Sequence, residues 1–438
     1  MTRVTVIGAG LAGSEAAWQC ARRGIPVRLV EMKPLEKSPA HSYDGFAELV
    51  CSNSLRSNQL HNAVGLLKEE LRLMGSLVLE AADATKVEAG GALAVDRTEF
   101  SDYITRKIKE HPLIEVVTER ADGWPSEGPV IIATGPLTDG ALAQHMNEYF
   151  GGEPLSFYDA AAPLIAYESI DMEKAFVASR YEKEGGDYIN CPMEKDEYMA
   201  FWEALCAAEE APVHGFEDSK VFEGCMPVEA MAKRGEDALR FGPMKPVGLV
   251  DPRTGRRPYA VVQLRKDNAA GSVYNMVGFQ THLKFPEQKR VFSMIPGLEN
   301  AEFLRYGVMH RNTFIDSPRL LDPFYRAKKD KRLLFAGQMT GVEGYVESTA
   351  SGLYAGTALA ISLTTGELPK PLSNQTATGA LASYISNPSV RDFQPMNINF
   401  GIINGEGIQA KGKKARIDAI VKRALAEVSA SDFATQQG

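Results

Sequence analysis

Residues 4–17, VTVIGAGLAGSEAA, decide the fold of this 438-residue chain. An apolar strand pattern leads into the motif G-x-G-x-x-G at residues 8–13, and a helical pattern follows from about Ser14 to Arg23. A second short strand, Val27–Val30, ends at the acidic residue Glu31. A strand, a glycine turn, a helix and a second strand that ends in an acid together predict a β-α-β unit that binds a dinucleotide.

Each position of this motif has a physical task in such a unit. Gly8 permits the tight turn, Gly10 lets the backbone approach a pyrophosphate, and Gly13 lets the helix and the strand pack closely. The helix N-terminus favours the phosphate charge, and Glu31 can accept hydrogen bonds from ribose hydroxyls. The predicted cofactor-binding residues at the amino end are therefore Gly8, Ala9, Gly10, Leu11, Ala12, Gly13 and Glu31.

Two later segments indicate a flavin rather than a free nicotinamide. Val130–Gly135 is an apolar strand that ends in Ala-Thr-Gly, and Arg332–Gln338 is another that ends in Ala-Gly-Gln before a helical pattern over Ser348–Ile361. Both resemble the flavoproteins built on the two-dinucleotide-binding-domain plan, although Asp is usual where this chain has Gln338. No second G-x-G-x-x-G occurs, so NADPH or NADH would bind without a Rossmann site of its own. The resemblance adds four cofactor-binding residues: Gly135, Gly337, Gln338 and Gly344.

The expected fold class is α/β, a Rossmann-like FAD domain with an inserted, mixed α+β and largely antiparallel domain. The FAD domain takes residues 1–150 and 324–438, and the inserted substrate domain takes residues 151–323. A hairpin is predicted from Tyr259–Leu264 and Ser272–Phe279, two alternating strands around a turn. An amphipathic helix over residues 59–75 would bury Leu60, Val64, Leu67, Leu71 and Met74.

Composition limits the class of protein. Apolar residues make up 44% of the chain and charged residues 24%, as in ordinary globular proteins. No apolar run approaches the roughly 18 residues of a membrane span, and no cleavable signal is recognisable, so we expect no membrane partner. Five cysteines without C-x-x-C spacing argue against a disulfide framework or a metal site and fit a cytoplasmic location.

Charge is unevenly distributed along the chain, whose net charge is -8. An acidic protein needs a local basic patch to bind nucleic acid. Three basic groups occur, each of which alone is more often a solvated face. They are Arg253 with Arg256 and Arg257; Lys328, Lys329, Lys331 and Arg332; and a C-terminal group that contains Lys411, Lys413, Lys414, Arg416, Lys422 and Arg423. The last group predicts a basic C-terminal helix.

Two of the five cysteines stand in unusual surroundings. Cys51 lies among serines and asparagines in residues 49–58, LVCSNSLRSN, whereas buried structural cysteines usually have apolar neighbours. Cys225 precedes Pro227, which suits the first position of a helix, and a helix N-terminus lowers the pKa of a thiol. A structural role remains open for both. Cys20 is expected in the core of the first helix, and Cys191 and Cys206 are expected to be structural.

Five stretches, in this order along the chain, resemble the folate- and FAD-dependent tRNA (uracil-5-)-methyltransferases. They are residues 4–17, residues 49–58, FEGCMPVEAMA (222–232), GVMHRNTFIDSPRLL (307–321) and FAGQMTGVEGYVESTASGL (335–353). The sister group, the glucose-inhibited division protein A family, shares the last stretch. It resembles a longer plan with a further C-terminal helical domain, for which this chain ends too early.

The resemblance implies a reaction at carbon 5 of the T-loop uridine of tRNA, giving ribothymidine. Methylenetetrahydrofolate supplies the carbon, and FAD with NADPH or NADH supplies electrons. A thiolate must add to carbon 6 of uracil, because that addition makes carbon 5 nucleophilic. Cys225 is assigned as this nucleophile and Cys51 as the base that removes the carbon 5 proton; the opposite assignment stays open.

Further site residues follow from the same resemblance. Tyr345 is expected near the flavin, where it could instead be a core ring at a helix start. The predicted substrate-binding residues are Asn53, Arg56, His310, Arg311, Asn312, Lys413 and Lys414. For Asn53 the alternative is local loop capping, and for His310 it is packing.

Three other functions remain open at this level. One is a flavin-dependent modification of the wobble uridine of tRNA, of the division-protein type, with a GTPase partner. Another is a small-molecule flavin oxidoreductase, in which the basic groups are only solvated surface. The last is a non-catalytic, FAD-stabilised RNA-binding protein. The sequence leaves the oligomeric state open.

Overall fold

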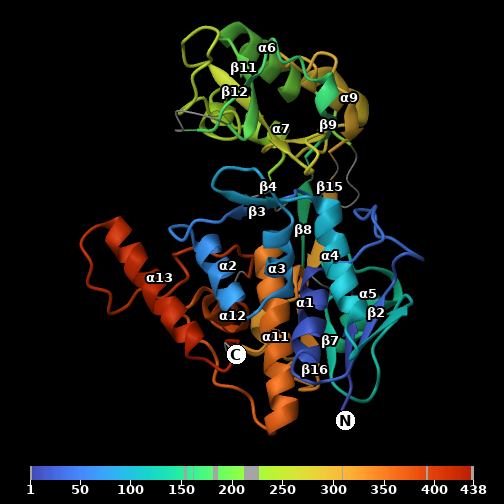
Figure 1. Cartoon of the computed structure of the whole chain (residues 1–438). Coiled ribbons are helices and arrows are strands. Elements are labelled where there is room, and N and C mark those ends of the chain that lie inside the picture. Colours follow the sequence, from blue (N-terminus) through green and yellow to red (C-terminus); the bar gives the residue numbers. More distant parts are fainter. Residues whose placement is uncertain are drawn as a thin grey trace.

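The computed structural model describes residues 2–151, 155–160, 162–180, 186–211, 226–307, 309–390 and 393–435, with only the backbone of 155–160 and 309–311. Two lobes are stacked one above the other, and the chain begins and ends in the lower one (Figure 1). The lower lobe contains a parallel sheet, and the upper lobe contains an antiparallel sheet. The predicted Rossmann-like fold class with an antiparallel insertion is confirmed.

The parallel sheet of the lower lobe has its central strand at the amino end of the chain. The strand order is β16-β7-β1-β2-β6, so strands from both ends of the sequence share one sheet. All five are mostly apolar, as expected for strands that helices cover on both faces. Their bounds are β1 Val4–Ile7, β2 Val27–Glu31, β6 Ile114–Thr118, β7 Val130–Ile132 and β16 Leu333–Phe335.

Two helices of the lower lobe lie side by side, α1 (Leu11–Ala21) and α11 (Tyr345–Thr365) (Figure 1). Their backbones are nearly in contact, since a Cβ on Gly352 would lie 2.1 Å from the carbonyl oxygen of Ala12. Both helices begin three residues earlier than predicted. Residues at the end of each glycine-containing turn already belong to the first helical turn, which the apolar pattern alone does not show.

The other helices of the lower lobe surround these two. The helix predicted over residues 59–75 is α2, but it begins only at Ala63, so Leu60 is 41% exposed. Val64, Leu67, Leu71 and Met74 are buried as predicted. The bounds are α2 Ala63–Leu73, α3 Leu77–Ala84, α4 Arg97–Glu110, α5 Gly140–Phe150, α10 Ser317–Leu320, α12 Ala377–Ser386 and α13 Lys413–Ser429.

The sheet of the upper lobe has the order β10-β11-β12-β13-β9-β14, and every pairing in it is antiparallel. The predicted hairpin is present as β12 and β13. The strands are β9 Leu164–Ala166, β10 Phe176–Val177, β11 Tyr188–Met193, β12 Ala260–Lys266, β13 Val273–Met276 and β14 Phe303–Arg305. The helices are α6 Lys195–Cys206, α7 Val228–Ala232, α8 Ala238–Phe241 and α9 Phe285–Phe292.

The chain passes between the lobes on a pair of antiparallel strands, β8 (Leu155–Ala160) and β15 (Met309–Phe314). A small sheet of β3 (Ser54–Ser57), β5 (Ala92–Val95) and β4 (Lys86–Val87) lies at the top of the lower lobe, below the upper one (Figure 1). The sequence analysis did not predict this sheet. The domain limits at residues 150 and 323 remain predictions.

Cys20 and Cys191 are buried thiols, as expected, and burial raises the pKa of each to about 12. Within the described ranges, no helix is both long enough and apolar enough to span a membrane. The same residues contain no cluster of His, Cys, Asp or Glu side chains that could hold a metal ion.

Candidate functional site

A cleft opens where β1, β2, β7 and β16 end. It encloses about 1240 Å³, including space that is continuous with solvent. Ligands of open parallel sheets bind in such a crevice, at the carboxyl ends of the strands. Most of the predicted cofactor-binding residues line it, namely Gly8, Gly10, Leu11, Ala12, Glu31, Gly135, Gly337 and Gln338, and so does Tyr345.

The three motif glycines differ in what surrounds them. A Cβ on Gly13 would lie 1.8 Å from the carbonyl oxygen of Gly8, and a Cβ on Gly8 would lie 2.6 Å from the carbonyl oxygen of Ala133. A Cβ on Gly10 would meet no atom within 4 Å. Gly8 and Gly13 therefore serve packing, whereas Gly10 leaves open space beside the backbone at the start of α1. This space suits a pyrophosphate group.

Glu31 is buried and holds the glycine turn by its carboxylate. Oε2 accepts a hydrogen bond from the N–H of Ala9 at 2.6 Å, and Oε1 accepts one from the N–H of Lys33 at 2.9 Å. Lys33 also lines the cleft, and burial lowers the pKa of its amine. The sequence analysis missed Lys33, because nothing in its local pattern separates it from a surface lysine.

The far end of the cleft is built around the start of α11. The N–H of Gly337 donates to Ser351 Oγ at 2.7 Å, and the amide nitrogen of Gln338 lies 2.7 Å from both carboxylate oxygens of Glu343. Gly344 is the N-cap of α11 with a φ of 112°, a backbone conformation that favours glycine. Gly344 therefore shapes the turn that brings Tyr345 to the cleft.

Tyr345 connects the cleft to the loop that carries Cys51. Its hydroxyl oxygen accepts hydrogen bonds from the backbone N–H groups of Cys51 at 2.7 Å and Ser52 at 3.2 Å. Burial raises the pKa of Tyr345, so its phenol remains protonated at neutral pH. Val50, the residue before Cys51, also lines the cleft. Cys51 is thus held at the edge of the predicted cofactor site.

Asn53 and Arg56 have protein partners in the structure. The Asn53 amide nitrogen donates to the carbonyl oxygens of Val95 at 3.0 Å and Lys266 at 2.9 Å, which joins the two lobes. Arg56 forms an ion pair with Glu347, a fully buried carboxylate on α11. Substrate contact for either residue remains a prediction, and the structure gives Asn53 a role between the lobes.

Several predicted residues lie outside the described part of the chain. Cys225 is not among the described residues, and neither are the side chains of His310 and Arg311. Asn312 follows them on β15 and is buried. The helix expected after Cys225 is α7, which begins at Val228 with Pro227 as its N-cap, one residue later than predicted.

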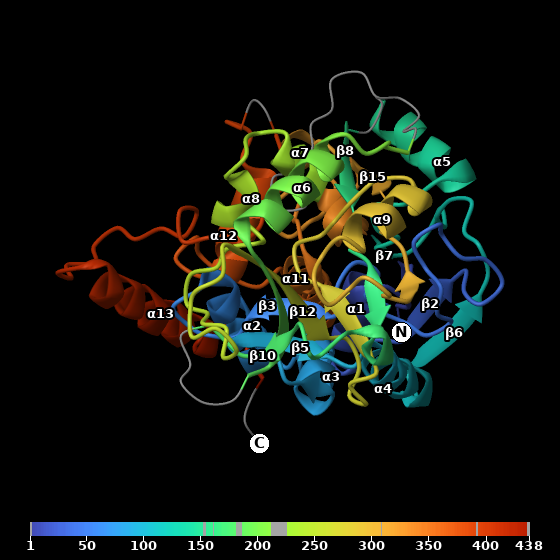
Figure 2. The ribbon, with the colours of Figure 1, turned by 90° about the horizontal axis from the view of Figure 1, so that it is seen from above.

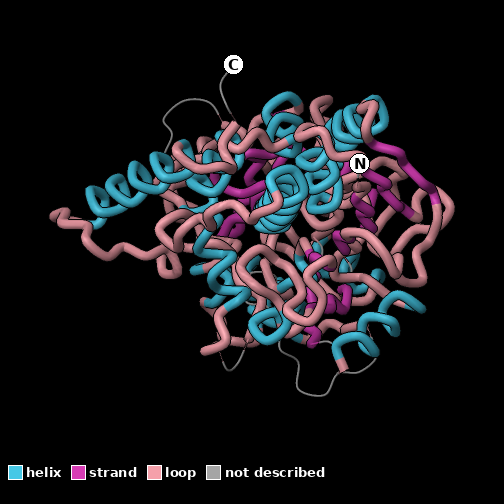
Figure 3. The backbone as a smooth tube through the Cα atoms, turned by 90° about the horizontal axis from the view of Figure 1, so that it is seen from below, coloured by secondary structure: helices cyan, strands magenta, loops and turns pink. Residues whose placement is uncertain are grey.

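The three basic groups are not equivalent. Arg253 is paired with Asp251 at 2.7 Å, and Arg332 is paired with Asp330 at 2.9 Å. Lys413 and Lys414, at the start of α13, are exposed and form no ion pair within the described residues. Figures 2 and 3 show α13 extending outward from the side of the molecule. Arg256 and Arg257 are also exposed and form no ion pair within the described residues, so the C-terminal group and this loop both present positive charge to a partner.

Comparison with known proteins assigns the chain to a family. The family model of glucose inhibited division protein A matches residues 3–367. A methylenetetrahydrofolate–tRNA-(uracil-5-)-methyltransferase TrmFO of Acetivibrio thermocellus is 60% identical over 96% of this chain and 97% of its own length. The chain belongs to the glucose inhibited division protein A family, in the TrmFO group. The TrmFO of Enterococcus faecalis is also 60% identical, over 97% of each chain.

The solved structures agree with this assignment at the level of the fold. The Aquifex aeolicus GidA structure, in its form II crystal, superposes with a TM-score of 0.72 at 16% identity. The superposition covers 100% of this chain and 74% of GidA. The two-lobed arrangement is therefore the fold of this family.

Proposed function

We propose that this chain methylates carbon 5 of the T-loop uridine of tRNA, with methylenetetrahydrofolate as the carbon donor and FAD with NADPH or NADH as the reductant. The observation that carries the proposal is the hydrogen bond that Tyr345 accepts from Cys51 at the edge of the nucleotide cleft. It puts a thiol in a polar loop next to a site that fits FAD. The names of the TrmFO relatives supply the substrates.

The cleft supports FAD as the cofactor through its shape and its donors. The open space beside Gly10 accommodates the pyrophosphate, and the N-terminus of α1 favours its charge. Glu31 lies where a ribose can reach it. The start of α11, with Gly337 and Tyr345, lines the other end, where a flavin ring would lie. When bound, FAD supplies the electrons that complete the methyl group.

The chain's own residues move electron pairs and protons on the uracil. A thiolate adds to carbon 6, which makes carbon 5 nucleophilic toward the one-carbon unit. A base then takes the proton from carbon 5, the electron pair of that bond forms the 5,6 double bond, and the thiolate leaves carbon 6. We assign the addition to Cys225, on the sequence pattern alone, and the proton transfer to Cys51.

Tyr345 has two tasks in this proposal. Its hydroxyl accepts hydrogen bonds from the N–H groups of Cys51 and Ser52, which fixes the backbone of the loop against the cofactor site. As a half-buried ring that lines the cleft, it also occupies the space between the Cys51 loop and the cofactor site.

Contact with tRNA is proposed for the basic group of α13. Lys413 and Lys414 occupy the first turn of the helix, where positive charge is unfavourable to the helix dipole. Helix stability therefore does not explain them, whereas an RNA phosphate backbone does. Because tRNA and folate are its substrates, we also propose that the protein acts in the cytoplasm.

The decisive experiment uses the purified protein with unmodified tRNA, methylenetetrahydrofolate and NADPH. Ribothymidine in the T loop, found by nucleoside mass spectrometry, is the expected product. A reaction that proceeds only with S-adenosylmethionine, or a product confined to the wobble position, would contradict the proposal. Cys225→Ala should abolish any trapped protein–uracil adduct, whereas an adduct that persists would move the nucleophile to Cys51.

A further inference from the structure

Three arginines hold the loop that carries Cys51, and each holds a different part of it. Arg97, at the start of α4, donates to the carbonyl oxygen of Leu49 at 2.7 Å. Arg305, at the end of β14, donates to the carbonyl oxygens of Val50 at 3.1 Å and Cys51 at 3.4 Å. Hydrogen bonds from charged donors are stronger than those between neutral groups, so these contacts fix the loop.

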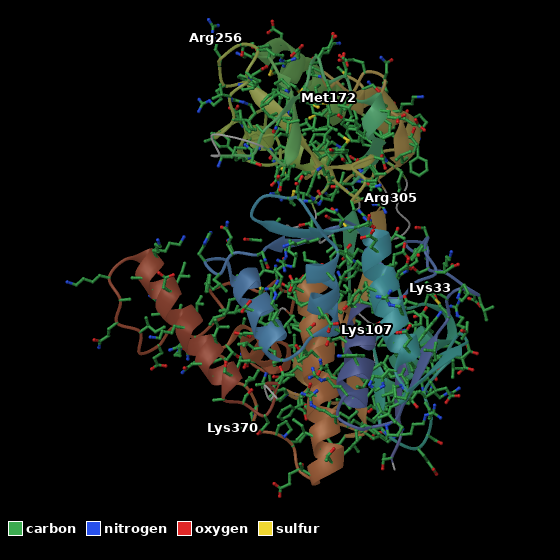
Figure 4. The ribbon with its side chains drawn as sticks, viewed as in Figure 1. Lys33, Lys107, Met172, Arg256, Arg305 and Lys370 are labelled. Atoms are coloured by element: carbon green, nitrogen blue, oxygen red, sulfur yellow. The ribbon has the colours of Figure 1, made fainter. Side chains whose placement is uncertain are left out.

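The third arginine completes the set. Arg265, on β12, donates to Ser52 Oγ at 2.7 Å and to the side-chain oxygen of Asn53 at 3.2 Å. Every residue from 49 to 53 is therefore bonded to a guanidinium group. Arg97 comes from the lower lobe, whereas Arg265 and Arg305 come from the upper lobe, and Figure 4 shows Arg305 at the junction of the two.

The two upper-lobe arginines differ from Arg97 in their counter-charge. Arg97 is paired with Asp267 at 2.8 Å. Within the described residues, Arg265 and Arg305 form no ion pair with a carboxylate. Both are largely withdrawn from water, and burial lowers the pKa of each, whereas the Asp267 carboxylate and, to a smaller extent, the nearby Cys51 sulfur raise it. A buried cation without a carboxylate in direct contact is stabilised by any further anion close by.

We propose that Arg265 and Arg305 are positioning residues for Cys51: they fix its loop from the upper lobe and bring two positive charges to the short segment that carries its sulfur, so that it stands as a thiolate. A thiolate can accept the carbon 5 proton of uracil and becomes a thiol as it does so. The inference rests on the proposed function for that last step. The charge state itself does not depend on it.

The other ionisable groups that face Cys51 are consistent with this assignment. Tyr345 from α11 is a neutral phenol, and Arg97 from α4 adds a third positive charge. Asp267 is the nearby acid, and Arg97 already binds it. The charge around the sulfur is therefore positive. The arrangement also makes Cys51 dependent on the upper lobe, so that a thiolate is stabilised only when the lobes are packed together as in this structure.

The test measures the rate at which iodoacetamide alkylates Cys51 between pH 5 and pH 10, by peptide mass spectrometry on the FAD-loaded protein. We compare wild type with Arg265→Gln and Arg305→Gln. Each substitution should move the midpoint of the profile upward by about one pH unit and slow the reaction roughly tenfold at pH 6. Arg265→Lys and Arg305→Lys, which keep the charge, should restore most of the midpoint.

Arg253→Gln is the matched control, since this arginine is in the same lobe but is paired with Asp251. It should leave the midpoint unchanged. Midpoints of the Gln variants that equal wild type would overturn the inference, as would Lys variants that shift as far as about one pH unit. If a Gln variant does not retain FAD, the Lys variant of the same residue is compared with wild type instead. A shift of its midpoint by about one pH unit then overturns the inference.

A second measurement separates the inference from the proposed function. The pH dependence of kcat for methylation should shift in the Gln variants in the same direction as the alkylation midpoint, with KM for tRNA nearly constant. An alkylation shift without a shift in kcat would overturn the base role of Cys51, and leave its charge state as inferred. The two failures are therefore distinguishable.

Discussion

The nucleotide cleft and the Cys51 loop are neighbours, but they are built in opposite ways. The cleft is formed by short contiguous segments, a strand and the glycine turn after it, and its shape depends on main-chain spacing. The Cys51 loop has no regular structure between Leu49 and Asn53. Its conformation depends on Tyr345 and on three arginines from distant parts of the sequence.

This difference has a functional consequence. A cofactor that stays bound through the catalytic cycle benefits from a rigid, locally encoded site. A loop that must meet a large RNA substrate benefits from contacts with both lobes, because it then adopts its active conformation only when the two lobes are correctly packed. The two regions should therefore respond differently to substitution.

The largest expected effect is on the loop, and it should leave the cleft intact. Cys51→Ala should lower the rate of ribothymidine formation by about 10³-fold or more, because a base is lost from the reaction. The protein should remain yellow and keep its melting temperature. Cys206→Ala, at a half-buried thiol on α6, is the control and should be nearly normal. Loss of FAD from Cys51→Ala would mean that the two regions are one structural unit.

A pair of alanine substitutions tests the cleft itself. Gly13→Ala places a Cβ 1.8 Å from a backbone oxygen and should prevent stable folding, since neither backbone can move aside. Gly10→Ala places a Cβ in open space and should leave the melting temperature of the FAD-free protein unchanged. We expect its FAD affinity to fall about 10- to 100-fold, by titration of flavin fluorescence. Equal stability of the two variants would contradict the packing difference.

A smaller effect is expected at the basic helix. The double substitution Lys413→Ala with Lys414→Ala should weaken tRNA binding about tenfold at moderate salt. The slope of log Kd against log salt should fall by roughly 1.5, the value for two lost phosphate contacts. The matching pair Lys328→Ala with Lys329→Ala should change neither the tRNA affinity nor the salt slope. The amines of these lysines bind the carbonyl oxygens of Pro318 and Tyr149. A slope that stays the same in the first variant would exclude α13 from the RNA interface.

The last effect is on stability and its pH dependence, and it concerns a buried lysine below the loop. Lys68 donates to the carbonyl oxygen of Leu55 at 2.8 Å, and burial lowers its pKa from 10.5 to about 7. Between pH 7 and pH 10 the unfolded chain therefore binds more protons than the folded one, so wild-type stability rises with pH in this window. Lys68→Met lacks this dependence, and its stability relative to wild type should be greatest near pH 7 and decrease by roughly 3 kcal/mol toward pH 10.

Denaturant unfolding at several pH values measures this difference. Lys109→Met, at an exposed lysine of α4, is the control and should show a constant difference from wild type. A constant difference for Lys68→Met as well would show that the amine remains charged in the folded protein.

The cleft could be predicted from the sequence because its determinants are adjacent in the chain. The tasks of Gly8, Gly10 and Gly13 follow from their spacing; the structure gives Gly8 and Gly13 close packing and Gly10 open space, and the approach of Gly10 to a pyrophosphate stays a prediction. The setting of Cys51 could be predicted only in part. Its polar neighbours mark an unusual thiol, but Arg265 and Arg305 belong to separate strands with ordinary alternating patterns, and only the tertiary fold brings them to the loop.

The same reason explains the residues that the sequence analysis interpreted differently. The amide of Asn53 bonds to backbone groups of both lobes, a contact that the sequence does not show, and its predicted contact with substrate stays a prediction. Leu60 matches a helical stripe in the sequence, but the helix begins three residues after it. The preceding turn, in which Gln59 and Asn62 bond to Ser57 Oγ, ends the pattern early, and such local competition is not visible in hydrophobic spacing alone.

The near contact of α1 with α11 has a mechanical consequence. With Gly352 and Gly356 pressed against the backbone of Ala12 and Ala16, the two helices cannot slide past each other without a clash. Helix α1 starts where a pyrophosphate would bind, and helix α11 starts with Tyr345, whose hydroxyl binds the backbone of the Cys51 loop. A displacement at one end of the cleft is therefore transmitted to the other end through this closely packed helix pair. The packing would fix the position of the adenine half of the cofactor relative to its reactive half.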